Sequence, residues 1–430
     1  MIKIIKELIN KNKLLIHNFS ALSALQVAEY VFPLITLPYL VRVLGPDKFG
    51  LVVFAQSFIA YFILLTEYGF KLSATREISI NRNDNNKVSQ IFCSVYIVYF
   101  LLFIVSTAVF SVIVFNIPKF HSEYIVYLFA YIMVFGTIIF PVWLFQGMEK
   151  MKYITIINVS VKLLFLIFIF IFIKNQDDYI YVPLISSLGF LMSGLIALVF
   201  GIKIFKIKLI LPKYHFVLHQ LKEGWYIFIS TIAISLYSNS NVFILGMFTS
   251  NTVVGYYSGA EKIIKAVKSL MIPISQSVYP HINKIANESH EKALFFIKKL
   301  FKIVGGGTFV MSSIIFLFAD RIISVALGPQ YQQSIIILRL LSFLPFLVGL
   351  SNVLGIQTML TFNFKKAFSK ILSIAGLFSI VAVFIIAPIY QGAGIALTLL
   401  ITELFITISM FVYLYKKGLN ILTLRKNEKK

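Results

Sequence analysis

Charged residues are scarce in this sequence, and their scarcity excludes an ordinary soluble protein. Only 13% of the 430 residues are Asp, Glu, Lys or Arg, whereas 59% are hydrophobic and 16% aromatic. Soluble domains carry about 25% charged residues, and the mean hydropathy here is +0.89. A chain of this length cannot cover a water-facing surface with so little charge. We therefore expect lipid to be the solvent for much of its area.

Cysteine is almost absent, and so are the motifs of cofactor sites. The single cysteine, Cys93, excludes an intramolecular disulfide and a cysteine-based metal site. His215 and His219 are four residues apart but lack the glutamate of a zinc protease motif. No glycine-rich loop ends in Gly-Lys-Ser/Thr, so transport driven by ATP hydrolysis is not expected. We expect no cofactor and no metal.

Long apolar stretches recur along the chain and predict an all-α integral membrane protein with about twelve transmembrane helices. A membrane-spanning helix needs about 20 apolar residues. The N-terminus is basic and then apolar without a small-residue cleavage site, which indicates a first membrane helix, not a removed signal peptide. The spans are predicted near residues 15–41, 49–70, 90–115, 123–145, 154–174, 179–202, 222–247, 253–280, 300–320, 331–360, 368–389 and 391–415.

The excess of positive charge is explained by topology. With both termini in the cytoplasm, 29 of the 39 Lys and Arg residues fall in cytoplasmic segments and 5 in outside loops. Lys and Arg concentrate in cytoplasmic loops of membrane proteins, so the net charge of +22 does not indicate nucleic-acid binding. No loop is much longer than 20 residues, which leaves no room for a soluble active site. We expect a transporter and not an enzyme.

The spans divide into two halves of six. We predict an N-terminal six-helix bundle (1–202), a basic cytoplasmic linker (203–221) and a C-terminal six-helix bundle (222–430). At an offset of 205 residues, Phe49-Gly50 aligns with Val254-Gly255, and both segments run from outside to inside. The repeat is therefore parallel. Transporters built from parallel six-helix halves hold their substrate at the repeat interface.

Charges inside spans are costly and mark candidate sites. In the predicted eighth helix, Glu261, Lys262, Lys265 and Lys268 share about a third of the circumference at 100° per residue. One interpretation is a cationic cavity wall that receives an anionic group such as a phosphate. The alternative is an internal Glu261–Lys265 ion pair, with Lys268 reaching towards the cytoplasm.

The other intramembrane charges allow two interpretations each. Arg339 either contacts substrate or pairs with Glu403 or another acid, and Lys162 is a candidate for cavity lining. Glu29, Glu403 and Glu261 are candidates for coupling to protons or another cation, because desolvation favours the neutral carboxyl group. For each carboxylate the alternative is a structural partner role.

Four segments resemble one transporter family. The stretch FPLITLPYLVRVLGPDKFGLVVFAQSFIAYFILLTEYGFKLSATREIS (32–79) resembles the N-terminal signature of Wzx-type polysaccharide flippases, with the core LPYLxRxLGPDxFG. The tracts FQGMEKMKY (145–153), VFILGMFTSNTVVGYYSGAEKI (242–263) and GPQYQQSIIILRLLSFLPF (328–346) are also similar to that family. The resemblance covers nearly the whole chain.

The resemblance implies a fold, a substrate and a location. The fold would be that of the multidrug/oligosaccharidyl-lipid/polysaccharide exporter superfamily, with two six-helix bundles around a central cavity. The substrate would be an oligosaccharide repeat unit on undecaprenyl pyrophosphate, flipped from the cytoplasmic to the periplasmic leaflet of the bacterial inner membrane. A polysaccharide polymerase and a chain-length regulator would be candidate partners.

Rival functions remain open at this point. A lipid-II-type flippase and a drug/cation antiporter share the superfamily fold, although an antiporter cavity should hold more acid than base. A major-facilitator transporter would carry a glycine-rich, arginine-dense loop after the second helix, which KLSATREISINRNDNNK lacks. A static membrane scaffold would leave the charged eighth helix unexplained.

Overall fold

The computed structural model describes residues 13–419, which form helices and their connections without a β-strand. The chain divides into two compact units. One contains the residues up to Leu44 and Leu51–Ser238, and the other contains Gly45–Gly50 and the residues from Asn239 onward. The domain boundaries that we predict from the sequence, with a linker at 203–221, stay a prediction.

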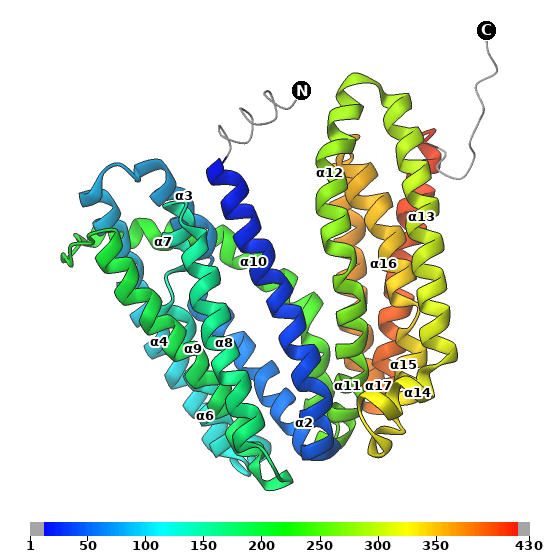
Figure 1. The fold of residues 1–430 in the computed structure, drawn as a ribbon, viewed down its shortest axis with the longest axis horizontal. Coiled ribbons are helices and arrows are strands. Elements are labelled where there is room, and N and C mark those ends of the chain that lie inside the picture. Colours follow the sequence, from blue (N-terminus) through cyan, green and yellow to red (C-terminus); the bar gives the residue numbers. More distant parts are fainter. Residues whose placement is uncertain (1–12, 420–430) are drawn as a thin grey trace. The chain divides into compact units, whose positions relative to one another are not determined.

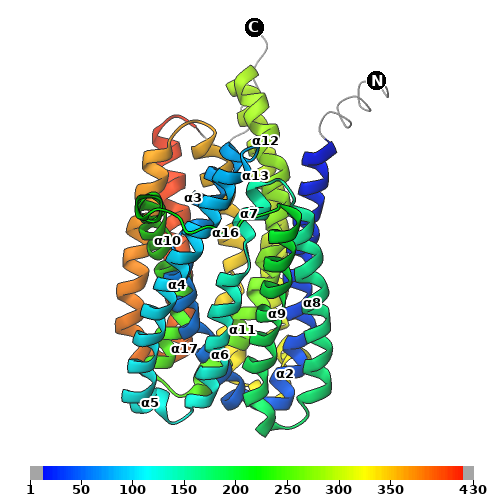
Figure 2. The ribbon, with the colours of Figure 1, turned by 90° about the vertical axis from the view of Figure 1, so that its left-hand side faces the viewer.

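The first unit is a bundle of long helices (Figures 1 and 2). Its core is strongly aromatic: Trp143, Phe70 and Phe145 are fully buried, and Phe110 stacks on Tyr131 with 4.1 Å between ring centroids. Offset aromatic pairs add to area burial. The helices of this unit are α2 (Lys13–Glu67), α3 (Phe70–Asn81), α4 (Asn85–Asn116), α5 (Pro118–His121), α6 (Tyr124–Ile139), α7 (Val142–Gly147), α8 (Met151–Phe172), η1 (Gln176–Ile180), α9 (Tyr181–Ile204) and most of α10 (Tyr214–Phe248).

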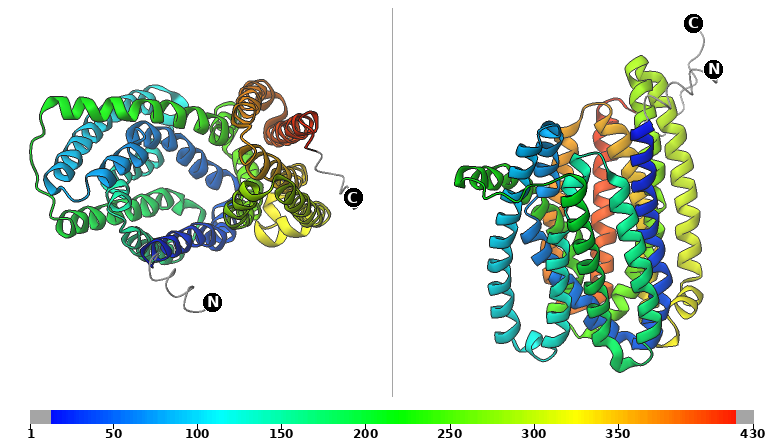
Figure 3. Two further views of the ribbon diagram at one scale, coloured as in Figure 1. Left: turned by 90° about the horizontal axis from the view of Figure 1, so that it is seen from above. Right: turned by 60° about the vertical axis from the view of Figure 1, so that its left-hand side comes forward.

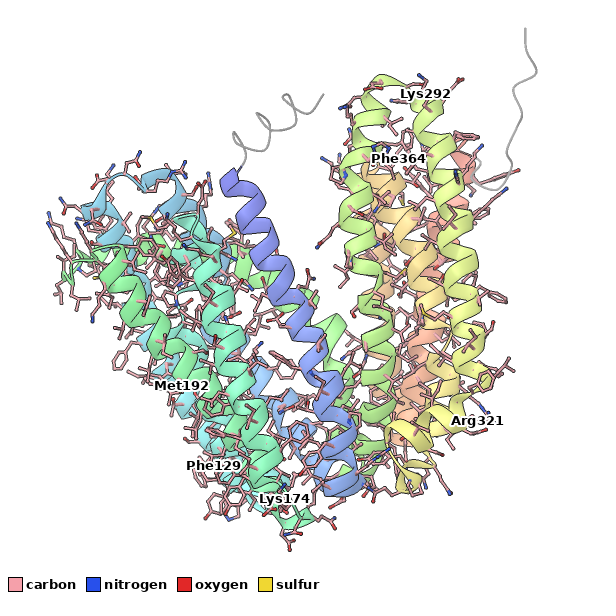
Figure 4. The ribbon with its side chains drawn as sticks, viewed as in Figure 1. Phe129, Lys174, Met192, Lys292, Arg321 and Phe364 are labelled. Atoms are coloured by element: carbon pink, nitrogen blue, oxygen red, sulfur yellow. The ribbon has the colours of Figure 1, made fainter. Side chains whose placement is uncertain are left out.

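The second unit is also helical throughout its described part. Lys292 and Arg321 lie at opposite ends of this unit, with Phe364 towards the Lys292 end (Figure 4). The topology predicted from the sequence puts Lys292 in a cytoplasmic segment and Arg321 in an outside loop, and this orientation stays a prediction. The helices are α11 (Asn251–Ser269), α12 (Met271–Glu288), α13 (His290–Leu317), α14 (Ala319–Ala326), η2 (Pro329–Tyr331), α15 (Ser334–Leu341), α16 (Leu344–Asn352), the π-helix η3 (Val353–Leu360) and α17 (Lys365–Lys416).

The predicted membrane spans coincide with observed helices. Eight helical stretches in the described residues are long and apolar enough to cross a membrane. Two of them, Leu25–Asn81 and Lys365–Lys416, contain non-helical residues at Gly45 and Gln391 and therefore cover two predicted spans each. The predicted spans 222–247 and 253–280 correspond to α10 and α11–α12, which are not among the eight. The number of crossings stays a prediction, and both termini lie outside the described residues.

Several predicted spans are not single helices. The span 123–145 is interrupted at Phe140, whose backbone is extended before Pro141. A residue before proline is pushed out of the α region, so the proline explains this break. The span 253–280 divides into α11 and α12 at Leu270, and the span 331–360 divides into η2, α15, α16 and η3.

A close backbone contact within the second unit joins the two segments that the sequence repeat aligns. A Cβ atom on Gly50 would overlap the carbonyl oxygen of Asn251 and come within 2.7 Å of the backbone nitrogen of Gly255. A Cβ atom on Gly255 would overlap the carbonyl oxygen of Pro46. Only glycine permits such an approach between backbones. The Gly50 and Gly255 positions are 205 residues apart, which is the offset of the repeat.

The turn inside α17 places a non-glycine residue in a backbone conformation that favours glycine. Gln391 has φ 51° and ψ −138°, a region that costs a residue with a Cβ atom about 1–3 kcal/mol. We expect Gln391→Gly to raise the melting temperature of the purified protein, corresponding to about 1 kcal/mol. Gln332→Gly is the control, because Gln332 is exposed with an ordinary φ of −54°. An unchanged or lower melting temperature for Gln391→Gly would contradict this.

Candidate functional site

The strongest candidate site is a charged stripe on α11, formed by Glu261, Lys262, Lys265 and Lys268. Helix α11 begins at Ser250, whose hydroxyl accepts the backbone N–H of Val253. The structure brings the predicted charges together as the helical periodicity requires. Glu261 is buried and accepts a hydrogen bond from Lys265, with 2.9 Å between Oε2 and Nζ. The Glu261–Lys265 ion pair of the alternative interpretation is therefore present.

The remaining lysines of the α11 stripe have weaker partners. The Lys262 Nζ lies 4.9 Å from the centroid of the Phe49 ring, a cation–π contact within the second unit. Lys268 interacts electrostatically with Glu403 of α17 and with Glu261. The Ser351 hydroxyl donates to Glu403 Oε1 over 2.7 Å and holds that carboxylate in place.

The charge balance of this cluster is positive. Three lysines face two carboxylates, Glu261 and Glu403, so one positive charge is left over. A carboxylate that pairs with one lysine cannot neutralise a second at full strength. The cluster can therefore accept an additional anionic group such as a phosphate oxygen.

Arg339 is paired elsewhere in the second unit. Its Nη2 donates to Asp320 Oδ2 over 2.8 Å, which joins α15 to α14. Of the partners considered from the sequence, the structure shows another acid and not Glu403. Both side chains are partly exposed, at 39% for Arg339 and 57% for Asp320. A substrate contact by Arg339 stays a prediction.

The Arg339–Asp320 pair offers a direct test of a structural role. We expect Arg339→Met to lower the melting temperature by about 1–2 °C, because a half-exposed ion pair contributes about 0.2–1 kcal/mol. The double variant Arg339→Met/Asp320→Leu should recover most of the loss. If transport also recovers in the double variant, Arg339 is structural. If transport stays low while the melting temperature recovers, Arg339 contacts substrate.

Lys162 and Glu29 form a separate ion pair in the first unit, with 3.3 Å between Nζ and Oε1. They line a cavity of about 230 Å³ between α2, α8 and α9, and the Lys162 Nζ lies 6.0 Å from the centroid of Phe190. Asn158 also lines this cavity. The pair fits both interpretations from the sequence, cavity lining for Lys162 and either coupling or a structural role for Glu29.

A polar cluster beside the π-helix η3 was not predicted from the sequence. The Ser275 hydroxyl donates to Asn352 Oδ1 over 2.9 Å, and Gln357 Nε2 donates to the carbonyl oxygen of Ser275 over 3.0 Å. Gln357 is buried. π-helical turns are rare and occur often at functional sites. No periodicity in the sequence indicates the extra residue per turn, which explains the omission.

Among the side chains that the structure describes, no three His, Cys, Asp or Glu groups lie close enough together to hold a metal ion. His219, one of the two histidines spaced four apart, instead contacts Glu77, with 2.8 Å between Nε2 and Oε1.

Comparisons with known sequences agree on one family. Residues 15–286 match the family described as polysaccharide biosynthesis protein. The "Putative O-antigen transporter" of Escherichia coli (strain K12) is 37% identical over 407 residues, which cover 94% of this chain and 98% of the relative. A Shigella dysenteriae protein of the same name is 27% identical over 383 residues, covering 89% and 96%.

Solved structures share the fold. The lipid II flippase MurJ, in an inward closed conformation, superposes with a TM-score of 0.68 at 14% identity, covering 93% of this chain and 87% of that chain. An inward-facing multidrug resistance MATE family transporter of the MOP superfamily gives 0.67 at 13% identity, covering 95% and 100%. At such identities the likeness concerns the fold alone.

These findings confirm the predicted fold class and the family resemblance. The relatives are transporters and flippases by name, which confirms the expectation of a transporter and not an enzyme. The apolar helices make the chain a multi-pass membrane protein. Because the family match covers more than half of the chain and a 37% identical relative is covered almost completely, the chain belongs to the polysaccharide biosynthesis protein family.

Proposed function

We propose that this protein flips an undecaprenyl-pyrophosphate-linked oligosaccharide from the cytoplasmic to the periplasmic leaflet of a bacterial inner membrane, by alternating access through a cationic cavity. The O-antigen transporters among its relatives and its fold support a flippase role. The observation that carries the choice of substrate is the positive excess of the α11 stripe. A pyrophosphate is the most highly charged part of such a substrate and needs positive partners.

The α11 stripe suggests how the substrate head group is held. The Lys262 ammonium lies against the Phe49 ring, so its three N–H donors can turn to phosphate oxygens. Lys265 would leave Glu261 when the pyrophosphate enters and return when it departs. This exchange replaces one charge-assisted contact by another, so neither the loaded nor the empty state leaves Lys265 uncompensated.

Three carboxylates are candidates for ion coupling. Glu261 and Glu403 each face a lysine of the α11 stripe, and Glu29 faces Lys162 in the first unit. A proton gradient directed into the cytoplasm drives export only if the proton crosses inward while the site holds no substrate. Proton and pyrophosphate would therefore exchange at the carboxylates.

The function can be tested with the purified full-length chain in proteoliposomes. The probe is a fluorescent oligosaccharide on undecaprenyl pyrophosphate, placed in one leaflet and detected with a membrane-impermeant glycosidase. We expect protein-dependent movement of the probe to the other leaflet. No movement above protein-free vesicles would contradict the proposal.

A substrate panel separates the rival functions. Lipid II and a hydrophobic organic cation should move more slowly than the oligosaccharide probe. If lipid II moves fastest, the protein is a lipid-II-type flippase, and if only the cation moves, it is an antiporter. A polymerase and a chain-length regulator remain candidate partners, tested by adding each to the vesicles and measuring a change in rate.

A further inference from the structure

The beginning of α10 has an orientation that a membrane-crossing helix does not need. In Figures 2 and 3 it runs across the direction of α4, α8 and α9 within the first unit, at the end of that unit where α3 and α7 lie. It follows residues 207–213, which are not helical. If α4, α8 and α9 cross the bilayer, this part of α10 lies along the membrane surface.

One side of this helix is fixed to the first unit. Gln220 donates to Glu77 of α3, and His219 contacts the same carboxylate. The Phe228 ring stacks on Tyr68 with 4.7 Å between centroids. A Cβ atom on Gly224 would come within 2.8 Å of the Tyr68 ring, so the helix approaches the end of α2 closely. The helix is therefore held in a fixed rotation about its axis.

An apolar edge borders this fixed side of the helix. At 100° per residue, Tyr214, Leu218, Trp225 and Ile229 fall within about 60° of one another. Tyr214 is 78% exposed, and Trp225 and Ile229 are exposed as well. Trp and Tyr are enriched at the membrane–water boundary. This edge has the composition of an interfacial helix.

The segment before α10 adds two exposed leucine side chains that lie between lysines in the sequence. Leu209 is 74% exposed and Leu211 is 95% exposed. Lys206, Lys208 and Lys213 surround them in the sequence and are also exposed. Leucine side chains exposed to this degree gain by entering the acyl boundary, while the lysine stems reach back to the phosphates.

We propose that residues 206–229 form an interfacial anchor that binds anionic phospholipid headgroups of the leaflet it lies in. The apolar edge supplies insertion and the lysines supply the preference for negative charge, because each Lys near an anionic surface adds to binding. The nearest acid on the helix, Glu223, faces Arg76 at 4.0 Å and so does not oppose the lysines at full strength. The proposal does not depend on the transported substrate.

Trp225 provides the readout. The chain has two tryptophans, and Trp143 is fully buried, so Trp143→Phe leaves Trp225 as a single reporter. The full chain is placed in vesicles of phosphatidylcholine with 25% phosphatidylglycerol. In one sample part of the phosphatidylcholine carries brominated acyl chains, and in the other the phosphatidylglycerol does. The mole fraction of brominated lipid is the same in both samples. We expect brominated phosphatidylglycerol to quench Trp225 about twofold more than brominated phosphatidylcholine. If Trp143→Phe fails to fold, the fluorescence of Trp225 is obtained by subtracting the fluorescence of Trp225→Phe from that of the parent chain.

Matched triple variants test the charge. Lys206→Gln, Lys208→Gln and Lys213→Gln together should abolish the preference for phosphatidylglycerol while quenching by lipid persists. Lys365→Gln, Lys366→Gln and Lys370→Gln remove three exposed lysines from the other unit and should leave the preference unchanged. Equal quenching by both lipids in the parent chain would overturn the anionic preference. If acrylamide quenches Trp225 and neither brominated lipid does, residues 206–229 do not insert into the membrane. Their exposed side would then contact water or a protein partner. Neither result depends on whether the chain flips its substrate.

Discussion

Lys262→Met is expected to lower the rate of oligosaccharide flipping about 10- to 100-fold. The loss corresponds to one hydrogen bond between charged groups, about 1.5–3 kcal/mol. Lys262 lies on the α11 stripe beside the Phe49 ring, whereas Lys265 is already paired with Glu261. Its removal leaves the remaining lysines balanced by two carboxylates, so the site loses its positive excess. The measurement is the initial rate in proteoliposomes, normalised to folded protein.

Two controls separate charge from folding in this experiment. Lys262→Arg keeps the charge and should retain a large part of the rate. Lys292→Met removes a lysine at the end of the second unit, which Figure 4 shows away from α11, and should change the rate little. A normal rate for Lys262→Met, with Lys292→Met also normal, would contradict the role of the α11 stripe.

Gly50→Ala and Gly255→Ala are each expected to prevent accumulation of folded protein. A methyl group at either position overlaps a backbone carbonyl oxygen, of Asn251 or of Pro46, and no rotamer change relieves that overlap. Overpacking costs about 1–3 kcal/mol where side chains can adjust, and we expect about 3 kcal/mol or more here because backbone must move. The measurement is the melting temperature and the yield of monodisperse protein after purification.

Gly306→Ala is the matched control, because it makes the same chemical change in the interior of a helix. A Cβ atom on Gly306 meets nothing within 4 Å, and alanine stabilises a helix interior by about 0.5–1 kcal/mol relative to glycine. We expect its melting temperature to stay level or rise. If Gly50→Ala and Gly255→Ala also melt at the parent temperature, the close contact is absent from the folded protein.

Much of the fold could be predicted from the sequence because hydropathy depends on local composition. The stretches 90–115, 154–174 and 179–202 coincide with α4, α8 and α9 within a few residues at most boundaries. Lipid demands about 20 apolar residues per crossing, and that demand is visible in any window. The path of α10 across its unit was not predictable in this way, since hydropathy does not report the direction in which a helix runs.

Part of the candidate site could also be predicted from the sequence, and part could not. The α11 stripe follows from helical periodicity, so the clustering of Glu261 and Lys265 could be predicted from spacing alone. The partners from distant segments could not: Asp320 lies 19 residues before Arg339, and Ser351 lies 52 residues before Glu403. These pairs depend on how helices pack, and a single sequence does not record that packing. Phe49 lies between these two cases. The internal repeat indicates that its segment matters, because Phe49 adjoins Gly50, but it does not indicate the contact with Lys262.

The proposed mechanism requires that the α11 stripe face a water-filled cavity that a lipid-linked pyrophosphate can enter. Single cysteines at positions 262 and 265, in a Cys93→Ala background, test it most directly. A membrane-impermeant thiol reagent is applied to spheroplasts and to inverted vesicles, with and without the lipid-linked oligosaccharide. We predict labelling at both positions from at least one side and a slower reaction when substrate is present. If folded variants are labelled from neither side, the stripe is internal to the protein, and the proposed cavity at the α11 stripe is contradicted.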